Sequence, residues 1–218
     1  MINIQRFVCN PLQVNTFVVS DETGECVIID CGAYYDNEHL AIQEYIGSHS
    51  LRPVHHLLTH GHFDHCIGAE VIYETYGLSP EIHSADVALY EDMTNQVAYF
   101  LGVNKEFPMP RPGRLLRQGD MVAFGSHSLE VIETPGHSSG GLTFYCKEEG
   151  VAFCGDTLFR MSIGRTDFDG GNEALMKHSL INVLGALPSE TKVYCGHGPA
   201  TDIGTEMQFN PFVKMFRG

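Results

Sequence analysis

The sequence predicts an α+β fold in which two packed sheets lie between helices. Strand-like segments fall into two groups, and helical segments lie between and after them. The chain has 218 residues, of which 43% are hydrophobic, so it can bury one substantial core. We therefore expect one domain that spans residues 1–218.

The predicted strands form an early and a late group. They cover residues 3–8, 15–20 and 26–30, and then 121–124, 129–134, 142–146, 151–154 and 192–195. An apolar stretch at 56–59 is typical of the end of a further buried strand. The two groups are long enough to form two sheets that share one core.

The predicted helices have apolar residues at helical spacing and cover residues 37–48, 66–76, 86–103 and 173–187. The last of them follows Asn172, whose side chain can cap a helix. Prolines at 108, 110 and 112 exclude regular structure after residue 103. The segment 86–114 is therefore either a lid over a functional site or a surface connection.

The run His60-Gly61-His62-Phe63-Asp64-His65 is the most informative part of the chain. A strand cannot present all four polar side chains on one face, because its side chains alternate. A loop that leaves a strand and enters a helix can do so. Imidazole and carboxylate donors suit zinc, iron, manganese or nickel. Four such donors so close together favour two metal positions.

Three later donors complete such a site. His137, Asp156 and His197 each follow a predicted strand and have a glycine next to them. Glycine permits tight turns and a close approach of the backbone. Each of these residues alone could be a capping or a buried polar residue, but together with the first run they predict metal binding.

The order His-x-His-x-Asp-His, His, Asp, His resembles the metallo-β-lactamase superfamily. The resemblance implies an αββα sandwich of two mixed sheets with outer helices. It also implies two sets of metal ligands that share one carboxylate. The first set is His60, His62 and His137, the second is Asp64, His65 and His197, and Asp156 bridges them.

Shorter runs narrow the resemblance to single-domain glyoxalase II-like proteins, also called hydroxyacylglutathione hydrolase-like. These runs are 155–159, 162–167, 196–201 and 210–212. They imply hydrolysis of a small acyl thioester, S-lactoylglutathione or an analogue with another thiol carrier. Only 21 residues follow His197. Longer glyoxalase II enzymes have a helical domain there that holds glutathione, so we expect loose binding of the carrier.

The implied chemistry uses two divalent ions about 3.5–4 Å apart, which lower the pKa of a shared water from 15.7 toward about 7. The resulting metal-bound hydroxide attacks the acyl carbon. Asp64 and Asp156 are the expected catalytic carboxylates, Asp64 by orienting the water and Asp156 by bridging the ions. We expect zinc in both positions, with iron or manganese as alternatives.

Two further residues are weaker candidates for the site. Asp30 ends a predicted strand and either hydrogen-bonds a ligand histidine or caps its own turn. Arg165 either binds a substrate carboxylate or pairs with Asp167 or Asp169 to hold its loop. Cys66 follows His65 directly, but we expect it to be a buried helix residue rather than a ligand. The remaining histidines are expected to be structural: His39, His49, His55, His56, His83, His127 and His178.

Other functions remain open at this stage. The run 164–168 resembles the persulfide dioxygenases, which use one iron at the first site. A lactonase has the same hydrolytic chemistry. A non-catalytic binding module on the same fold is the third alternative, and the complete donor set argues against it.

Composition excludes several partners. The formal net charge is −14, with 13 basic and 27 acidic residues and no basic run, so we expect no nucleic-acid partner. No apolar run approaches the roughly 20 residues that span a bilayer. The start of the chain lacks the features of a signal peptide. Seven cysteines without paired spacing indicate free thiols, and we therefore expect a cytoplasmic protein.

Overall fold

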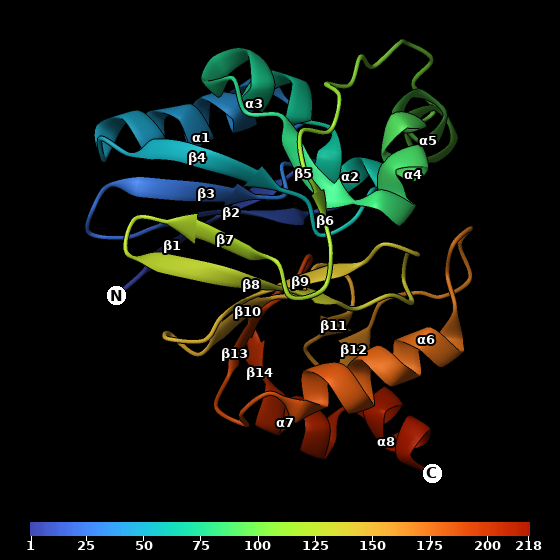
Figure 1. The fold of residues 1–218 in the computed structure, drawn as a ribbon. Coiled ribbons are helices and arrows are strands. Elements are labelled where there is room, and N and C mark those ends of the chain that lie inside the picture. Colours follow the sequence, from blue (N-terminus) through green and yellow to red (C-terminus); the bar gives the residue numbers. More distant parts are fainter.

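The computed structural model describes residues 1–218 and contains two six-stranded sheets packed face to face (Figure 1). The first sheet has the order β1 (Asn3–Cys9), β2 (Val14–Ser20), β3 (Glu25–Ile29), β4 (Arg52–Leu57), β5 (Pro80–His83) and β6 (Leu115–Leu116). Its strands are antiparallel up to β3 and parallel from there on.

The second sheet is mainly antiparallel. Its order is β14 (Thr201–Asp202), β13 (Lys192–Tyr194), β10 (Val151–Phe153), β9 (Leu142–Cys146), β8 (His127–Glu133) and β7 (Met121–Phe124). Only β10 and β13 pair in parallel. A separate hairpin consists of β11 (Leu158–Phe159) and β12 (Ser162–Ile163).

Helices cover the outer face of each sheet (Figure 1). The first sheet carries α1 (Asp36–Ser48) and α3 (Ala69–Tyr76), and the second carries α6 (Glu173–His178), α7 (Ile203–Phe209) and α8 (Pro211–Arg217). The short helices α2 (Phe63–Cys66), α4 (Val87–Glu91) and α5 (Met93–Leu101) lie at one end of the sandwich. The predicted αββα architecture is confirmed.

The main core lies between the sheets. It contains side chains from both, including Phe17, Leu57, Leu129 and Phe144, all of them buried. Two smaller apolar clusters fill the spaces between each sheet and its helices. All seven cysteines are buried free thiols, Cys66 among them.

Three predicted helices are interrupted in the structure. The helix expected at 66–76 begins as α2 and restarts as α3 after Gly68, which packs against Cys31. The helix at 86–103 is divided into a 3₁₀ turn, α4 and α5. The helix at 173–187 begins at its predicted Asn172 cap, but continues after His178 as a π-turn and a 3₁₀-turn. A hydrogen bond from Ser179 to a distant loop, described below, accompanies the last break.

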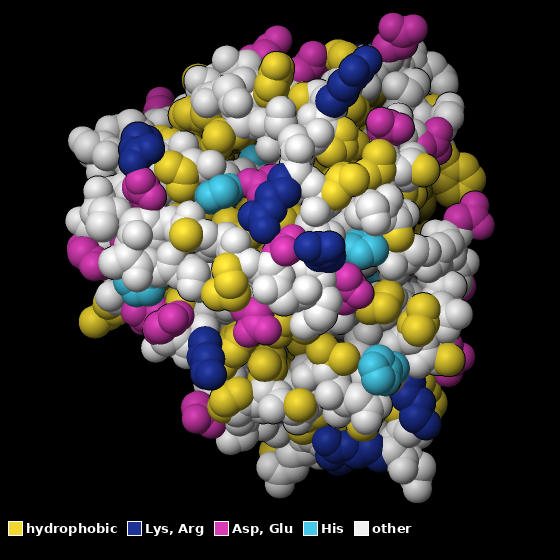
Figure 2. All heavy atoms as spheres, in the orientation of Figure 1, with side chains coloured by type: hydrophobic (Ala, Val, Ile, Leu, Met, Phe, Trp, Pro, Cys, Tyr) yellow, Lys and Arg dark blue, Asp and Glu magenta, His cyan; other side chains and the backbone are white.

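The predicted strands were correct to within one or two residues at each end. The strands β5, β6, β11, β12 and β14 and the helices α7 and α8 were not predicted, since their sequences are short or lack a clear period. No helix is both long and apolar enough to cross a membrane. On the face seen in Figure 2, acidic and basic side chains are interspersed among hydrophobic ones.

His56 on β4 makes the fold sensitive to acid. It is completely buried, neither ring nitrogen has a hydrogen-bond partner, and burial lowers its pKa from 6.5 to about 3. Below pH 6.5 the unfolded chain therefore binds a proton that the folded chain cannot take up until about pH 3. Stability from this group is complete above pH 6.5 and is lost as the pH falls toward 3.

Wild type should lose about 2 kcal/mol of unfolding free energy between pH 7 and pH 5 through His56. We expect this part of the loss to be absent in His56→Leu. Urea unfolding at both pH values, with a chelator present, measures this difference between wild type and variant. His178→Ala is the control, because His178 is exposed and should leave the pH dependence unchanged. An identical pH dependence in His56→Leu would show that His56 is not the acid-sensitive group.

Candidate metal centre

Four loops at one end of the sandwich carry the seven predicted ligands. The loop after β4 enters α2 and supplies His60, His62, Asp64 and His65. The other three come from the second sheet: His137 lies between β8 and β9, Asp156 follows β10, and His197 follows β13. The structure thus brings together residues from 60 to 197 in sequence.

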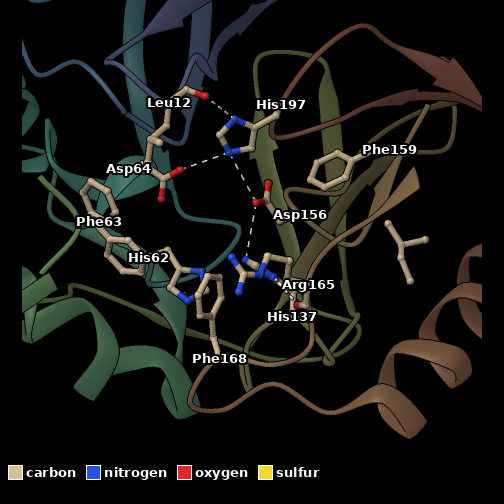
Figure 3. Close-up of a pocket in the computed structure, with 12 residues that line it drawn as sticks. Leu12, His62, Phe63, Asp64, His137, Asp156, Phe159, Arg165, Phe168 and His197 are labelled. Carbon is tan, nitrogen blue, oxygen red and sulfur yellow. Dashed lines mark hydrogen bonds and ion pairs between the residues drawn. The ribbon is translucent and has the colours of Figure 1, made fainter. Parts of the chain in front are cut away.

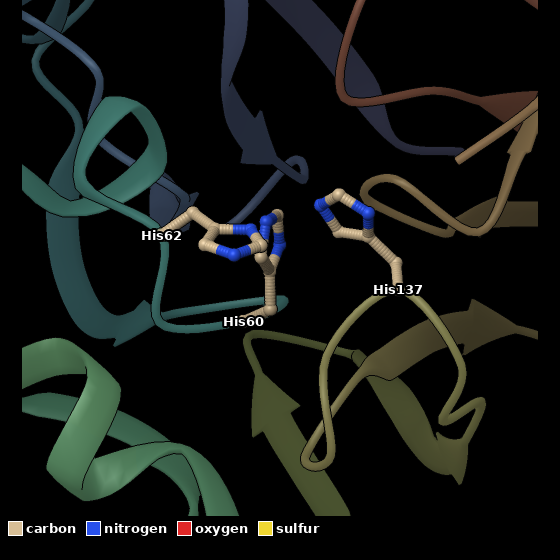
Figure 4. A group of neighbouring side chains, drawn as sticks. All are labelled: His60, His62 and His137. Carbon is tan, nitrogen blue, oxygen red and sulfur yellow. The ribbon is translucent and has the colours of Figure 1, made fainter. Parts of the chain in front are cut away.

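The first predicted donor set is compact. One ligand atom from each of His60, His62 and His137 lies within 4.8 Å of the others. Figure 4 shows the three rings directed toward one another. All three residues are buried, with at most 8% of their surface exposed. This geometry could hold one ion between three imidazoles.

The second set forms an equally tight group. Asp64, His65 and His197 also have donor atoms within 4.8 Å of one another. Nε2 of His197 is 3.2 Å from Oδ2 of Asp64, and Nε2 of His65 is 3.8 Å from the same oxygen. A second ion could lie among these three donors.

Asp156 contacts both donor sets. Its Oδ1 is 3.3 Å from Nε2 of His65, and its Oδ2 is 3.5 Å from Nε2 of His197. The same Oδ2 is 3.6 Å from Nε2 of His137, in the first set (Figure 3). One carboxylate thus lies where the resemblance places the bridging ligand.

Asp30 holds one of these histidines in place. Its Oδ2 accepts a hydrogen bond from Nδ1 of His65 at 2.8 Å, and its two oxygens also accept bonds from the amide and the hydroxyl of Thr59. Asp30 is buried and has φ of +54°, a left-handed conformation that costs energy for a residue with a Cβ. Of the two expected roles, the geometry shows the bond to the histidine.

Backbone carbonyls orient two more rings. Nδ1 of His137 donates to the carbonyl of Arg165 at 2.8 Å, and Nδ1 of His197 donates to the carbonyl of Leu12 at 3.0 Å. In both rings this leaves Nε2 toward the centre of the site. Such outer bonds fix the tautomer and direction of a histidine ligand.

Two histidines of the first donor set, His60 and His62, are kept neutral. Burial lowers the pKa of His60 well below its ordinary value and that of His62 to about 4. A metal ligand must be deprotonated, so these two rings need not lose a proton when an ion binds.

The second donor set attracts positive charge. Burial opposes protonation of His65, but the carboxylates of Asp156, Asp64 and Asp30 outweigh it and raise its pKa well above the ordinary value. Burial likewise would raise the pKa of Asp156, yet the neighbouring histidines lower it. The carboxylates of Asp156 and Asp64, whose pKa values are both lowered, thus face a region that favours cations.

The buried donors fit a metal. Nε2 of His60, Nε2 of His65 and Oδ1 of Asp156 are buried and have no hydrogen-bond partner within the protein. A buried polar atom without a partner costs about 1–3 kcal/mol. Cations bound between these atoms would satisfy all three, and nitrogen and oxygen donors of this kind suit zinc, iron and manganese.

A cavity of about 390 Å³ opens onto both donor sets (Figure 3). Half of its twelve lining residues are hydrophobic: Leu12, Phe63, Phe100, Phe159, Ile163 and Phe168. Arg165 also lines it, but its guanidinium donates two hydrogen bonds to Asp167 and lies over the ring of Phe168. Of the alternatives for Arg165, the structure shows the pairing with Asp167.

The sequence did not reveal Asp86, which joins two metal loops. Its buried carboxylate accepts a hydrogen bond from the amide of Gly61 at 3.0 Å and from the amide of Gly140 at 2.6 Å. It thereby ties the His60 loop to the His137 loop. An acidic residue at a predicted helix start gives no hint of such a role.

A further group of possible donors lies outside the centre. Asp21, Glu22 and His127 are close together, but Asp21 already accepts bonds from Thr23, Ser126 and His127. These bonds join the turn after β2 in the first sheet to the turn after β7 in the second sheet. The predicted structural role of His127 fits this network.

The β11–β12 hairpin, which carries Phe159, is held by two buried residues. Oε2 of Glu206 accepts hydrogen bonds from the amide of Met161 at 2.9 Å and from Nδ2 of Asn210 at 2.8 Å. Nδ2 of Asn210 also donates to the carbonyl of Ser162 at 3.0 Å. Asn210 and Glu206 are completely buried, so the hairpin cannot shift without breaking these bonds.

We expect Asn210→Ala to loosen the hairpin and so the apolar wall that it supplies to the cavity. Losing these buried bonds should lower stability by about 1–3 kcal/mol. In a kinetic assay the variant should mainly show a raised KM. The lost wall contacts would be made equally in the ground state and the transition state. Steady-state kinetics and thermal unfolding test this, with the exposed Asn37→Ala as control. A fall in kcat at unchanged KM would contradict the positioning role.

The fold and the two donor sets define a metallo-beta-lactamase fold with a candidate centre for two metal ions. The sequence model of the metallo-beta-lactamase superfamily matches residues 9–197, and the chain therefore belongs to this superfamily. It is 35% identical to the probable metallo-hydrolase YqgX of Bacillus subtilis, over 97% of this chain and 98% of that protein. It is 32% identical to the hydroxyacylglutathione hydrolase GloC of Haemophilus influenzae, over 98% and 99%.

Two solved structures are also similar. BLEG-1 B3 metallo-beta-lactamase is 34% identical with a TM-score of 0.88, over 98% of this chain and 99% of that one. TTHA1623 in a di-iron-bound form is 38% identical with a TM-score of 0.83, over 95% and 99%. The predicted superfamily is thus confirmed.

Proposed function

We propose that this protein hydrolyses small acyl thioesters, S-lactoylglutathione or an analogue with another thiol carrier, with two divalent ions in the centre. The observation that carries the proposal is the contact of one carboxylate, Asp156, with histidines of both donor sets. The similarity to GloC supports the substrate class, and the di-iron form of TTHA1623 supports two ions.

His60, His62 and His137 would hold one ion, Asp64, His65 and His197 the other, and Asp156 both. When bound, such ions supply a hydroxide at neutral pH and polarise the acyl carbonyl. We propose zinc as their identity, with iron or manganese as alternatives.

The side chains orient the reacting groups and give the cavity an apolar lining. Asp64 is nine-tenths buried, and its Oδ2 lies 3.2 Å from Nε2 of His197, so it can accept a hydrogen bond from a water or hydroxide in a fixed direction. Phe63, Phe159 and Phe168 line the same cavity and give it an apolar surface. A thiolate is a good leaving group, so no strong general acid is required of the protein.

A complete second donor set distinguishes this proposal from a persulfide dioxygenase with one iron. Asp64, His65 and His197 lie together with His65 fixed by Asp30, which a single ion at the first set would leave unused. A lactone would satisfy the same geometry as a thioester. We further propose a cytoplasmic location, a small-molecule substrate and no nucleic-acid or membrane partner.

The proposal is tested with protein loaded separately with zinc, iron or manganese. The substrates are S-lactoylglutathione, a lactone, the β-lactam nitrocefin and glutathione persulfide, with oxygen consumption followed throughout. We expect thioester cleavage without oxygen uptake, faster than the cleavage of the lactone or of nitrocefin. Oxygen uptake by the iron form without thioester cleavage would favour the dioxygenase instead.

A further inference from the structure

The metal centre has an aromatic wall on the side of its first donor set. This wall consists of Phe63, Phe100 and Phe168. The rings of Phe63 and Phe100 are stacked with centroids 5.2 Å apart. Phe168 lies edge-on to Phe100, and the centroids of these two rings are 5.8 Å apart. Phe168 is also 5.6 Å from the ring of His62. An apolar surface of three rings thus adjoins the predicted first ion.

Phe100 is unusually exposed for a ring in a cavity. It comes from α5, and 42% of its surface is accessible, whereas Phe63 behind it is buried. Covering exposed apolar surface with an apolar ligand group is favourable in proportion to the area covered. A ring or branched alkyl group laid against Phe100 and Phe168 would gain this energy, and the single methyl group of a lactoyl chain would gain little.

A second cavity continues beyond the aromatic wall. It has a volume of about 570 Å³ and shares His62, Phe100 and Phe168 with the metal cavity. The other lining residues are Leu89, Asp92, Asn95, Gln96, Tyr99, Asp167 and Asp169. The two rings are thus bordered by both cavities, so a group larger than lactoyl that lies against them can be accommodated.

The charge of the outer cavity decides which end of a thioester points there. Its charged lining residues are aspartates only, and Asp167 is paired with Arg165, which leaves Asp92 and Asp169. Glutathione carries two carboxylates and one ammonium, so like charges disfavour its entry. The uncharged acyl end is thus directed to the aromatic wall, and the carrier lies toward Leu12 and Phe159.

We propose that the substrates are thioesters with an apolar acyl group of aromatic size, and that Phe100 and Phe168 select them. This inference rests on the proposed thioester hydrolysis and specifies its substrate class. A lactoyl group fits the cavity but leaves the aromatic wall uncovered.

The test compares S-mandeloylglutathione with S-lactoylglutathione on the metal-loaded full-length protein. The two share carrier and 2-hydroxyacyl group and differ by phenyl against methyl. We expect kcat/KM to be at least about tenfold higher for the mandeloyl thioester, given the 10–200-fold effects of apolar contacts in pockets. Phe168→Ala and Phe100→Ala should each bring this ratio close to one, whatever happens to the separate rates.

Tyr73→Ala is the matched control, since Tyr73 is a partly exposed aromatic residue on the outer helix α3 and should leave the ratio unchanged. A wild-type ratio of one or less, or an unchanged ratio in Phe168→Ala, would overturn the inference. If neither thioester is cleaved, the proposed function fails. Calorimetry with the thioether S-phenacylglutathione then still tests the wall. Phe168→Ala should weaken binding at least about tenfold, and equal affinity would refute selection by the wall.

Discussion

Asp156→Ala is expected to lower kcat/KM for the thioester by about a thousandfold or more, which corresponds to roughly 4 kcal/mol of transition-state stabilisation. The carboxylate lies 3.3–3.6 Å from histidines of both donor sets. Without it two cations would face each other with no shared anion. We therefore expect the variant to lose at least one metal equivalent as well as activity.

Metal content by mass spectrometry and steady-state kinetics measure these two losses separately. The fold should persist, because the carboxylate lies in a loop after β10 and outside the main apolar core. The exposed Asp36→Ala is the matched control and should retain metal and turnover. Activity of Asp156→Ala within tenfold of wild type would contradict the bridging role.

That the seven candidate ligands lie together could be predicted, because histidine is scarce and the donors follow a distinctive order. His60 to His65 form one run, and Asp156 and His197 each follow a strand and flank a glycine. Chemistry of this kind is local in sequence, and strand ends place it at one edge of the sheets. The pairing of Asp30 with His65 could be proposed for the same reason.

The π-turn after His178 and the role of Asp86 could not be predicted, because both involve partners distant in sequence. Ser179 donates a hydrogen bond to the carbonyl of Pro135 at 2.7 Å, in the loop that carries His137. The helix there widens into a π-turn, a form often found at functional sites. Asp86 likewise bonds amides at residues 61 and 140. Periodicity within a segment carries no information about such bonds.

The walls of the cavity were also missed. Phe100 was read as part of a helical apolar stripe, and Phe168 as part of a motif shared with another enzyme class. Both are apolar residues whose burial by a helix neighbour or by a ligand looks the same in sequence. Only the stacking of Phe100 on Phe63, and its exposed outer face, reveals the difference.

Gly196 packs against the candidate ligands Asp156 and His65. Its replacement is expected to cause the second large loss of metal binding and activity. A Cβ at this position would lie 2.1 Å from Oδ1 of Asp156 and 2.7 Å from Cε1 of His65. The backbone cannot move away, because the Gly196 amide donates to the carbonyl of Gly155 at 2.7 Å and its own carbonyl accepts from Asn15 at 2.7 Å. One methyl group would therefore displace two predicted ligands.

We expect Gly196→Ala to weaken metal binding and to lower kcat/KM by about a hundredfold, at the upper end of the losses seen when the surroundings of metal ligands are changed. Calorimetric titration of the metal-free protein with zinc measures the zinc affinity without relying on turnover. Gly47→Ala in α1 is the matched control, since its added methyl group meets no atom within 4 Å. It should bind zinc normally and gain about 0.5–1 kcal/mol of stability from the better helix former. Wild-type zinc affinity in Gly196→Ala would mean that Asp156 and His65 can move aside freely, and that their observed positions are not those in which they bind metal.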